Sequence, residues 1–413
     1  MSETVTILGA GIVGICSALS LLERGQRVRL IDRGDPGQET SLGNAGVVSP
    51  WSIIPQSTPG LWRSIPGMIL SRNKPLSVRA GTWPRMIPWG LRLLAQGTEA
   101  RTRRAAEAMD HLCAPSIDLY HRHLAGTGHE GLIRDSHYIH AFRDEAAARD
   151  AFDSLGYRIR AEKGAPMEVI DHAALKRMEP AIGPAYRAAI TIGAQARCTN
   201  PGRMGQVLAQ KARSMGAEII RDEVQALTET ETGWHITGQA QSYDAAQVVI
   251  AMGAWSAALL RPLGYRLPLM AERGYHIECE NPGVSLENSI MDMDGKFVAS
   301  SMEGGVRIAG QAEFGPAEAP PDPRRKGILA RQAREVFPDL NVAQARFWMG
   351  RRPSFPDSLP VLGPSGRHKG LYFCFGHSHY GLMMAPKSGE VLADHLTGTR
   401  PNLPLAAYSA SRF

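Results

Sequence analysis

Three glycines near the start of the chain, followed by one acidic residue, have the spacing of a phosphate-binding turn. Gly9, Gly11 and Gly14 form the pattern Gly-x-Gly-x-x-Gly, and Asp32 follows the last glycine by 18 residues. The first glycine permits a tight turn, the second lets a pyrophosphate approach the backbone, and the third allows close helix–strand packing. Because an acid at this distance can accept hydrogen bonds from both ribose hydroxyls, the pattern predicts dinucleotide binding.

The elements that must position this turn are visible in the same segment. Residues 4–8 (TVTIL) are a β-branched run typical of a buried strand, residues 12–24 have helical apolar spacing, and residues 27–31 predict a second strand. Gly25 stands where the helix should end. Strand, glycines, helix, strand and acid lie in register within about thirty residues, which favours a nucleotide-binding domain over a helix merely rich in glycine.

A loop of small residues after Asp32 bears on the choice between two cofactors. Residues 39–49 read ETSLGNAGVVS, at a place where an NAD-binding domain would normally enter its next helix directly. Small residues and an asparagine suit a loop whose amides contact the pyrophosphate or the ring of a bulkier cofactor. The loop therefore favours FAD over NAD.

Four motifs lie along the chain in a fixed order. They are the Gly9–Asp32 unit, the loop Ser41-x-x-Asn44-Ala-Gly46, residues 248–256 (VVIAMGAWS), and a C-terminal block with Gly350-Arg-Arg352-Pro353, then Gly376-His377, Gly381 and Gly389-x-x-x-Ala393. Together they resemble the flavin-dependent D-amino-acid oxidase superfamily, and within it the bacterial D-amino-acid dehydrogenases of the small-subunit type. The resemblance covers essentially the whole chain.

The resemblance implies an α/β fold, in which a Rossmann-like, doubly wound FAD-binding domain is joined to a discontinuous α+β substrate-binding domain. We expect residues 1–80, 196–265 and 341–413 to form the FAD-binding domain, and residues 81–195 and 266–340 to form the substrate domain. The pattern itself predicts further strands and helices, at 218–221, 248–251, 273–279, 296–300, 306–310 and 370–375 for strands and at 99–125 and 201–215 for helices.

FAD contacts are expected from the residues that match the family motifs. They are Gly9, Gly11, Ile12, Val13, Gly14, Asp32, Arg33, Ser41, Asn44, Ala45, Gly46, Val47, Val224, Gly253, Trp255, Gly376, His377, Gly381, Leu382 and Met383. In the family, the helix that opens at Gly381 directs its N-terminus at the flavin pyrimidine end, where negative charge develops on reduction. Noncovalent FAD is expected, because neither the surroundings of Ser354 nor the 41–46 loop offers the cysteine or histidine that tethers flavin in some relatives.

A substrate carboxylate requires a fixed fork of hydrogen-bond donors, which arginine supplies. Arg352 matches the arginine of the family's G-x-R-P motif, which binds the substrate carboxylate, and it is our first candidate. The adjacent Arg351 makes the choice between the two arginines less secure, and Arg273 is a further candidate. A structural ion pair is the alternative role for Arg352.

Four aromatic or imidazole side chains are further candidates for substrate contacts. Tyr275 and His276 are neighbours on a strand-like segment, so only one of them can line the pocket. His379 and Tyr380 flank the flavin loop, where either could contact substrate or be a satisfied structural residue. The histidine cluster at 377–379 has no carboxylate or cysteine partners nearby in sequence, so no metal is expected.

The resemblance implies oxidation of a D-amino acid, or of a cyclic or secondary amino acid, by hydride transfer to flavin N5. The imine product would hydrolyse to a 2-oxo acid, and the electrons would pass to a quinone-type acceptor. One alternative is an oxygen-using oxidase of glycine-like or N-alkylated amino acids, since it shares every motif above. Another is an electron-relaying flavoprotein subunit of a larger complex, although such a subunit needs no carboxylate clamp.

The composition indicates the class of protein and its compartment. The 413 residues are 43% hydrophobic and 21% charged, as in globular proteins, and five scattered cysteines without a C-x-x-C motif favour a reducing compartment with buried thiols. Residues 5–22 carry no charge, but the glycine motif explains them better than a signal or membrane segment. We expect a cytoplasmic protein, with an oligomeric state that the sequence does not define.

Residues 40–98 contain no acidic side chain and carry six cations, which equals the net charge of +6 of the whole chain. Trp51, Trp62, Trp83 and Trp89 lie among these cations, a composition suited to peripheral binding at the inner face of the cell membrane. The alternative is a cofactor-covering loop with a solvated basic edge. Nucleic-acid binding is not expected, because no known module accompanies the charge.

Overall fold

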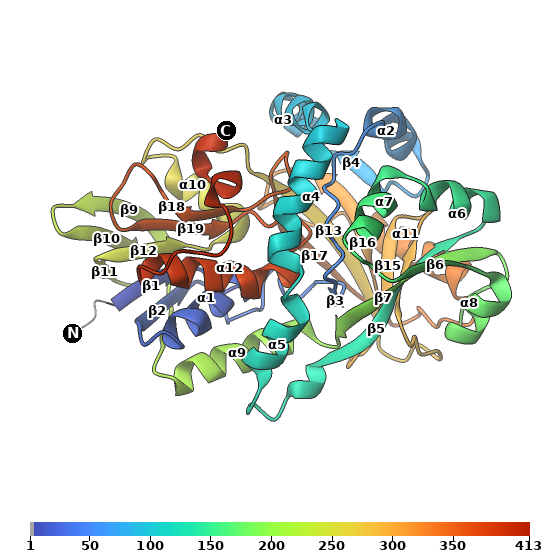
Figure 1. Cartoon of the computed structure of the whole chain (residues 1–413), viewed down its shortest axis with the longest axis horizontal. Helices are drawn as coiled ribbons and strands as arrows, with labels where there is room; N and C mark the ends of the chain where they lie inside the picture. Colours follow the sequence, from blue (N-terminus) through green and yellow to red (C-terminus); the bar gives the residue numbers. More distant parts are fainter. Residues whose placement is uncertain (1–3) are drawn as a thin grey trace.

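The computed structural model describes residues 4–413 and contains two main β-sheets that lie side by side (Figure 1). The first has six strands in the spatial order β18 (Val361–Pro364), β19 (Leu371–Phe375), β12 (Gln247–Ile250), β1 (Thr4–Leu8), β2 (Arg27–Asp32) and β8 (Glu218–Arg221). Neighbours from β19 to β8 run parallel, and β18 runs antiparallel to β19. The β1 and β12 strands are apolar runs buried at nearly every position, as expected in a parallel sheet covered on both faces.

Helices cover one face of this sheet and a smaller sheet covers the other. The helices are α1 (Ile12–Leu22), α9 (Pro201–Ser214) and α12 (Gly381–Leu396), with α4 (Glu99–Cys113) and α5 (Ser116–Leu124) packed against α12. The opposite face carries the short helix α10 (Ser256–Leu260) and three antiparallel strands, β9 (Val224–Thr230), β10 (Gly233–Gly238) and β11 (Ser242–Ala245). The predicted Rossmann-like α/β fold is confirmed, although this small sheet stands where a doubly wound fold would have helices.

The second sheet has ten strands and a mixed, largely antiparallel order. Along its main path lie β17 (Arg346–Ser354), β13 (Met270–Cys279), β16 (Gly305–Phe314), β15 (Phe297–Met302), β14 (Ser289–Asp292), β5 (Ile133–Phe142), β7 (Ala188–Cys198) and β3 (Val47–Val48), while β4 (Leu76–Val78) pairs with β16 and β6 (Met167–Asp171) pairs with β7. Because β3, β4 and β17 belong to this sheet, the chain crosses between the two sheets within residues 1–80 and again within 341–413.

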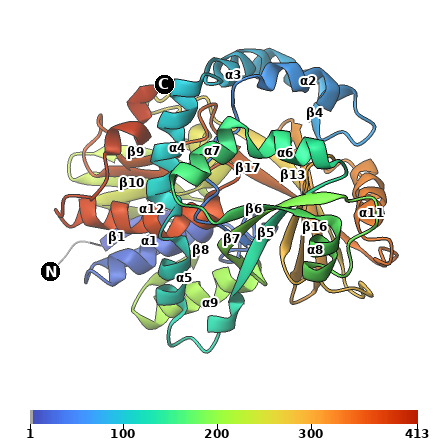
Figure 2. The ribbon, with the colours of Figure 1, turned by 45° about the vertical axis from the view of Figure 1, so that its right-hand side comes forward.

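The remaining helices surround the second sheet. They are α2 (Leu61–Leu70), α3 (Trp83–Ala95), α6 (Glu145–Phe152), α7 (Leu155–Glu162), α8 (His172–Met178) and α11 (Arg324–Val336), with 3₁₀ turns at Ala80–Thr82, Glu130–Leu132, Gly253–Trp255, Leu405–Tyr408 and Ala410–Arg412. The α11 helix packs on β13 and β16 and closes a hydrophobic core with them. At the top of both ribbon views, α2 and α3 lie next to each other above the sheet (Figure 2).

The predicted elements agree with the structure apart from one helix that a proline divides and one strand that begins earlier. The helical pattern predicted for 99–125 is two helices, because Pro115 stands between α4 and α5 and cannot donate a backbone hydrogen bond. The strand predicted for 273–279 begins three residues earlier, at Met270. All five cysteines are free and buried, as the sequence predicted.

Candidate active site

One cavity of about 1350 Å³ runs between the two sheets, from the glycine turn of β1 to the concave part of β13. This volume exceeds that of a pocket for a single drug-sized ligand, so it can hold a dinucleotide and a small substrate together. Every predicted cofactor residue lines it except Gly14 and Gly46. Those two glycines have packing roles, because a Cβ at Gly14 would overlap the Gly9 carbonyl and one at Gly46 would lie 2.5 Å from the Cys198 carbonyl oxygen.

The glycine turn presents backbone amides at the entrance to α1. Gly9 has a φ of +107°, and a Cβ there would lie 2.5 Å from the Ala251 carbonyl oxygen of the neighbouring strand end. The Ile12 amide donates to Ser41 Oγ at 3.0 Å, which ties the 39–49 loop to the helix N-terminus. In α1, whose residues are all described, no acidic side chain occupies the first turn. The positive end of the helix is therefore available to a phosphate.

Asp32 is held in place by two backbone amides at the end of β2. Its carboxylate accepts from the Ala10 amide at 2.6 Å and from the Gly34 amide at 2.8 Å, and its side chain still lines the cavity. The guanidinium of the next residue, Arg33, lies 4.3 Å from the centre of the Trp255 ring. A ribose hydroxyl acceptor and a flat aromatic–guanidinium pair therefore lie at one end of the cavity.

The opposite wall of the nucleotide end is the turn between β19 and α12. Gly376 has a φ of +87°, and the following backbone leads to Gly381, Leu382 and Met383 at the start of α12, all of which line the cavity. The His377 ring is buried and lies 3.0 Å from Ser388 Oγ, and its burial lowers the pKa of His377 to about 3. It is thus a neutral, structural side chain of the turn.

At the substrate end, a buried glutamate that sequence reasoning did not identify contacts four side chains, of which Gln56, Arg352 and His379 line the cavity. Glu272 accepts from Arg352 Nη1 at 2.9 Å and from Ser354 Oγ at 3.0 Å, and it accepts from Gln56 Nε2 at 3.1 Å. His379 Nε2 lies 2.5 Å from the same carboxylate. Burial alone would raise the pKa of the Glu272 carboxyl, but His379, Arg352 and Gln56 hold that pKa well below its usual range.

The pairing of β13 with β17 explains how Arg352 reaches the cavity. Glu272 and Arg352 are direct cross-strand partners, and Gly274 pairs with Gly350 two residues further along. A Cβ at Gly274 would overlap the Arg352 guanidinium, so the glycine provides the space in which the fork lies. Arg352 Nη1 also donates to the Gln311 carbonyl at 2.9 Å, whereas its Nε and Nη2 atoms donate to no residue between 4 and 413. Two donors of the fork are thus free for a ligand.

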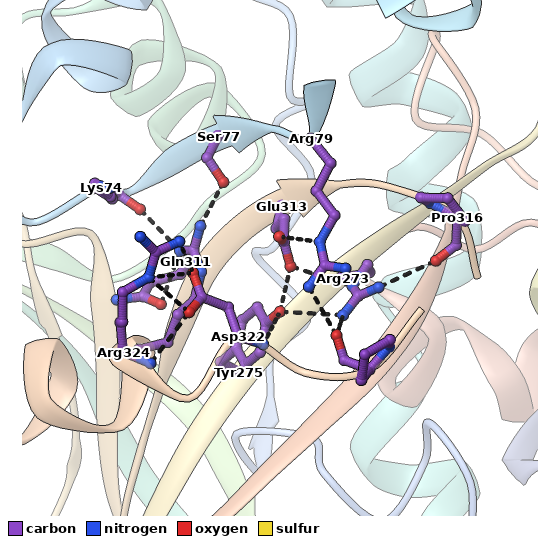
Figure 3. A network of polar contacts seen from close by, with 12 residues as sticks. Lys74, Ser77, Arg79, Arg273, Tyr275, Gln311, Glu313, Pro316, Asp322 and Arg324 are labelled. Carbon is purple, nitrogen blue, oxygen red and sulfur yellow. Dashed lines mark hydrogen bonds and ion pairs between the residues drawn. The ribbon is translucent and has the colours of Figure 1, made fainter. Parts of the chain in front are cut away.

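The other candidates for substrate contacts lie in different places. Tyr275 is among the residues that line the cavity, but its phenol donates to Glu313 within a buried network that also holds Arg273, on the side of β13 turned to α11 (Figure 3). His276 stacks on Trp348 and contacts the Gly43 carbonyl at 3.2 Å, and its burial lowers the pKa to about 3.

His379 and Tyr380 both line the cavity, on the turn that precedes α12. The Tyr380 hydroxyl donates to the Ile54 carbonyl at 2.7 Å, and burial raises the pKa of this phenol. Arg351, the neighbour of the first candidate arginine, donates to the Ala317 carbonyl at 2.6 Å and lies over Trp255, at the nucleotide end. Of the two adjacent arginines, only Arg352 contacts the Glu272 cluster.

The cavity has a further wall that the sequence did not reveal. Tyr138 and His140 come from alternate positions of β5, and Tyr157 and Arg160 come from α7. The i, i+2 spacing of Tyr138 and His140 on a strand is the one signal in the sequence that places two of these residues on one face. The α2 and α3 helices complete the wall with apolar side chains, among them Ile65, Met68, Met86 and Leu94.

A sequence model of the family described as FAD dependent oxidoreductase matches residues 4–395. The chain therefore belongs to this family, and it is an FAD-dependent oxidoreductase. It is 36% identical to a protein named D-amino-acid oxidase from Bradyrhizobium diazoefficiens, over 99% of this chain and 98% of that protein. It is 32% identical to a D-amino acid dehydrogenase from Methylobacterium nodulans, over 99% of both.

Solved structures of amino-acid-oxidising flavoenzymes have the same fold. The L-proline dehydrogenase from P. horikoshii superposes with a TM-score of 0.76 at 18% identity, covering 100% of this chain and 98% of that one. Glycine oxidase from Geobacillus kaustophilus superposes with a TM-score of 0.75 at 22% identity, covering 100% of both chains. The predicted family resemblance and the FAD cofactor are confirmed.

Proposed function

We propose that this FAD-dependent oxidoreductase oxidises a D-amino acid, or a cyclic or secondary amino acid, whose α-carboxylate is bound by Arg352. The product would be an imine that hydrolyses to a 2-oxo acid. The observation that carries the proposal is the guanidinium of Arg352, which lines the cavity near the Gly376–Gly381 turn with Nε and Nη2 free. The names of the relatives, D-amino-acid oxidase and D-amino acid dehydrogenase, support the substrate class.

The cavity fits the nucleotide part of FAD at the end opposite to Arg352. When bound, FAD supplies the isoalloxazine ring, which accepts a hydride from the carbon that bears the amine. The first-turn amides of α1 would bind its pyrophosphate, Asp32 its ribose, and the N-terminus of α12 its pyrimidine end. We propose that the six-stranded sheet is the core of the FAD-binding domain and the ten-stranded sheet that of the substrate domain.

The protein's own part in the reaction is orientation and exclusion of water. Glu272 and the Gln311 carbonyl both accept from Arg352 Nη1, so the fork is fixed before substrate arrives. A carboxylate held in two hydrogen bonds places its α-carbon at a defined position against the turn before α12. The apolar side chains of α2 and α3 exclude water from the same space.

Anaerobic reduction tests this proposal directly. The purified protein should be yellow and should release free FAD in acid, since no covalent link is proposed. Mixing it without oxygen with D-, L- and N-substituted amino acids should bleach the flavin with the D-amino acids or with proline-type imino acids. A yellow protein that none of these compounds bleaches would contradict the proposed substrate class.

We further propose that a quinone-type acceptor reoxidises the enzyme at a membrane surface. Six of the large apolar side chains that the described chain exposes lie on α2 and α3, namely Trp62, Ile69, Leu70, Trp83, Ile87 and Leu91. Five exposed cations without an ion pair to residues 4–413 accompany them, namely Arg63, Arg72, Lys74, Arg85 and Arg92. We call these residues the basic tryptophan surface. No helix among residues 4–413 has the length and apolarity needed to cross a membrane.

The basic tryptophan surface suits anionic lipid, because its apolar side chains can enter the bilayer interface while the cations contact headgroups. Trp89 does not take part, since it is buried with its Nε1 donating to the Pro268 carbonyl at 3.0 Å. Anionic liposomes should sediment the protein at low salt and release it at high salt. The Trp62→Ser/Trp83→Ser variant should bind less than the wild type at low salt. Equal binding by wild type and variant would contradict this role.

Direct reoxidation by oxygen is the second candidate, favoured by the relative named D-amino-acid oxidase. The two acceptors are distinguished after anaerobic bleaching. Return of the yellow colour with a quinone analogue but slowly with oxygen supports the dehydrogenase. Rapid return with oxygen alone, together with hydrogen peroxide formation, supports the oxidase.

A further inference from the structure

The cavity contains an arginine whose charge no carboxylate balances. The other arginines of its wall each form an ion pair, Arg33 with Glu39, Arg351 with Glu39 and Glu318, and Arg352 with Glu272. Arg160 has no carboxylate within 4.0 Å among residues 4–413. A half-buried guanidinium without a counter-ion is costly, because its hydration is reduced and no protein charge replaces it. A bound anion would remove that cost.

The Arg160 guanidinium is fixed along one edge and free along the other. Its Nε donates to the Trp51 carbonyl at 2.9 Å and its Nη1 to the Gly156 carbonyl at 3.4 Å. The guanidinium lies 5.2 Å from the centre of the Tyr157 ring. Its Nη2 donates to no residue of the described chain, and the side chain lines the cavity. The arginine is therefore held in position with an unused donor.

The neighbours of Arg160 are neutral and include an unused hydroxyl. The Tyr157 hydroxyl contacts His140 Nδ1, and burial lowers the pKa of His140 to about 3, so that this ring carries no charge. Tyr138 stacks edge-on against His140, with ring centres 4.6 Å apart, and its hydroxyl makes no hydrogen bond to residues 4–413. The nearby charge of Arg160 opposes the rise that burial causes in the pKa of Tyr138. A guanidinium edge and a phenol that donate to no residue between 4 and 413 thus line the same cavity.

This cationic wall lies in the same cavity as the Arg352 fork. Tyr380 lies between Arg160 and the Arg352 fork. Its ring centre is 6.2 Å from that of His379, and His379 contacts Glu272. The charge of Arg160 lowers the pKa of the Tyr380 phenol, against the rise that burial causes. Arg352 is neutralised by Glu272, so Arg160 contributes uncompensated positive charge to the substrate end. Lys296, which also lines the cavity and forms no ion pair within the described residues, adds to that charge from the turn between β14 and β15.

We propose that Arg160, with the hydroxyl of Tyr138, binds a second carboxylate of the substrate while Arg352 binds the α-carboxylate. The preferred substrates would then be dicarboxylic amino acids, with the second acid on the side chain or on the amine substituent. The inference rests on the proposed function for the role of Arg352. It adds a subsite whose ligand is identified by its charge.

Glutamate and glutamine provide the test, because they have nearly the same shape and differ in one charge. Anaerobic flavin reduction is measured with both enantiomers of each. For the enantiomer that reacts, the wild type should show at least a tenfold preference in kcat/KM for glutamate. Arg160→Met should lower kcat/KM for glutamate by about 10- to 100-fold and for glutamine by less than threefold. Arg160→Lys should restore part of the preference.

Arg158→Met is the matched control, since Arg158 is an exposed residue of the same helix. It should leave both rates unchanged. Tyr138→Phe keeps the ring and removes only the hydroxyl, so it should lower kcat/KM for glutamate by a smaller factor than Arg160→Met does. This variant replaces Arg160→Met in the test if Arg160→Met does not fold. A wild type that shows no preference for glutamate, or an Arg160→Met variant that loses both rates equally, would overturn the subsite.

Ligand binding separates this inference from the proposed reaction. Glutarate and its monoamide are titrated into the oxidised holoenzyme, and the change in flavin absorbance gives their dissociation constants. Glutarate should bind more tightly than the monoamide, and Arg160→Met should abolish that difference. If no amino acid bleaches the flavin but the difference is present, the proposed function fails and the anion subsite stands. If amino acids bleach the flavin and the difference is absent, the subsite alone fails.

Discussion

The two faces of β13 each carry an arginine–glutamate pair, and only one pair leaves room for a ligand. On the cavity face, Glu272 pairs with Arg352 at 2.9 Å, and the guanidinium keeps Nε and Nη2 free. On the face turned to α11, Arg273 pairs with Glu313 at 3.2 Å and donates to the Pro316 and Pro320 carbonyls, at 3.1 and 2.6 Å. Arg273 is fully buried, both of its Nη atoms donate within the protein, and its Nε faces Glu313, so no edge of this guanidinium is open to a ligand (Figure 3).

An ion pair does not by itself distinguish a structural arginine from a ligand-binding one. The distinction lies in the donors left over after the protein's own acceptors are satisfied. A network whose members are all satisfied stabilises the fold, whereas a fork with a free edge can bind a carboxylate. Variants on the two faces should therefore change different measurements.

The largest effect is expected from Arg352→Ala. It removes the donors for the α-carboxylate and leaves Glu272 buried without its arginine, so kcat/KM should fall by about a thousandfold, equivalent to about 4 kcal/mol. FAD content should remain that of the wild type, because the nucleotide end of the cavity is untouched. Steady-state kinetics and the flavin absorbance of the purified variant measure both. Unchanged kinetics would show that another group binds the carboxylate.

Glu313→Gln should affect stability instead of turnover. The substitution leaves Arg273 charged and fully buried without its counter-ion, and breaking such a pair costs about 3 kcal/mol of unfolding free energy. The kcat/KM per folded flavoprotein should remain within twofold of the wild type. Chemical denaturation measures the unfolding free energy, and steady-state kinetics below the unfolding transition measure kcat/KM. A large loss of kcat/KM at full folding would place this network in the active site.

Gly274→Ala should produce an intermediate effect on turnover. The added methyl group overlaps the Arg352 guanidinium, which must move, so kcat/KM should fall by about tenfold while the fold is retained. Gly327→Ala is the control, because Gly327 lies within α11 with open space at its Cβ position. That variant should gain about 0.5–1 kcal/mol of stability without a change in kcat/KM. Equal kinetics for the two variants would mean that Arg352 needs no such space.

The smallest effect concerns His276, two residues beyond Gly274 on β13. Burial lowers its pKa to about 3, so the unfolded state binds the proton more readily. The stability from the neutral ring is essentially complete by about pH 7.5 and is lost as the pH falls through 6.5 toward 3, with a loss of about 0.8 kcal/mol at pH 6.0. His276→Phe keeps the stack on Trp348 without a titratable group. Its thermal midpoint should fall less than that of the wild type between pH 7.5 and 6.0, and a parallel fall would refute the assignment.

The nucleotide end of the cavity was predictable because its residues are close together in the sequence. Gly9, Gly11 and Asp32 lie within one strand–helix–strand unit, so their spacing fixes their geometry. Arg352 was accessible through its motif for a similar reason, since Gly350 and Pro353 accompany it. Cross-strand partners are different: Glu272 meets Arg352 only through the register of β13 and β17, and no spacing in the chain encodes that register.

The far wall of the cavity could not be predicted because its residues come from separate elements. Arg160 is one of two arginines of α7, and its lack of a counter-ion becomes visible only when α7 is placed beside β5. The alternation of strands did predict that Tyr275 and His276 point in opposite directions. It did not predict that the Arg273 network would occupy one side and the Trp348 stack the other.

The α2 helix contains no fully buried side chain, although its inner residues line the cavity. A helix that removes so little apolar surface from water gains little free energy from remaining docked. Its amides should therefore exchange with solvent at a lower opening free energy than those of α12, which is anchored by ten buried residues. We therefore expect α2 to detach locally from the wall over the substrate end without unfolding of the nucleotide-binding core.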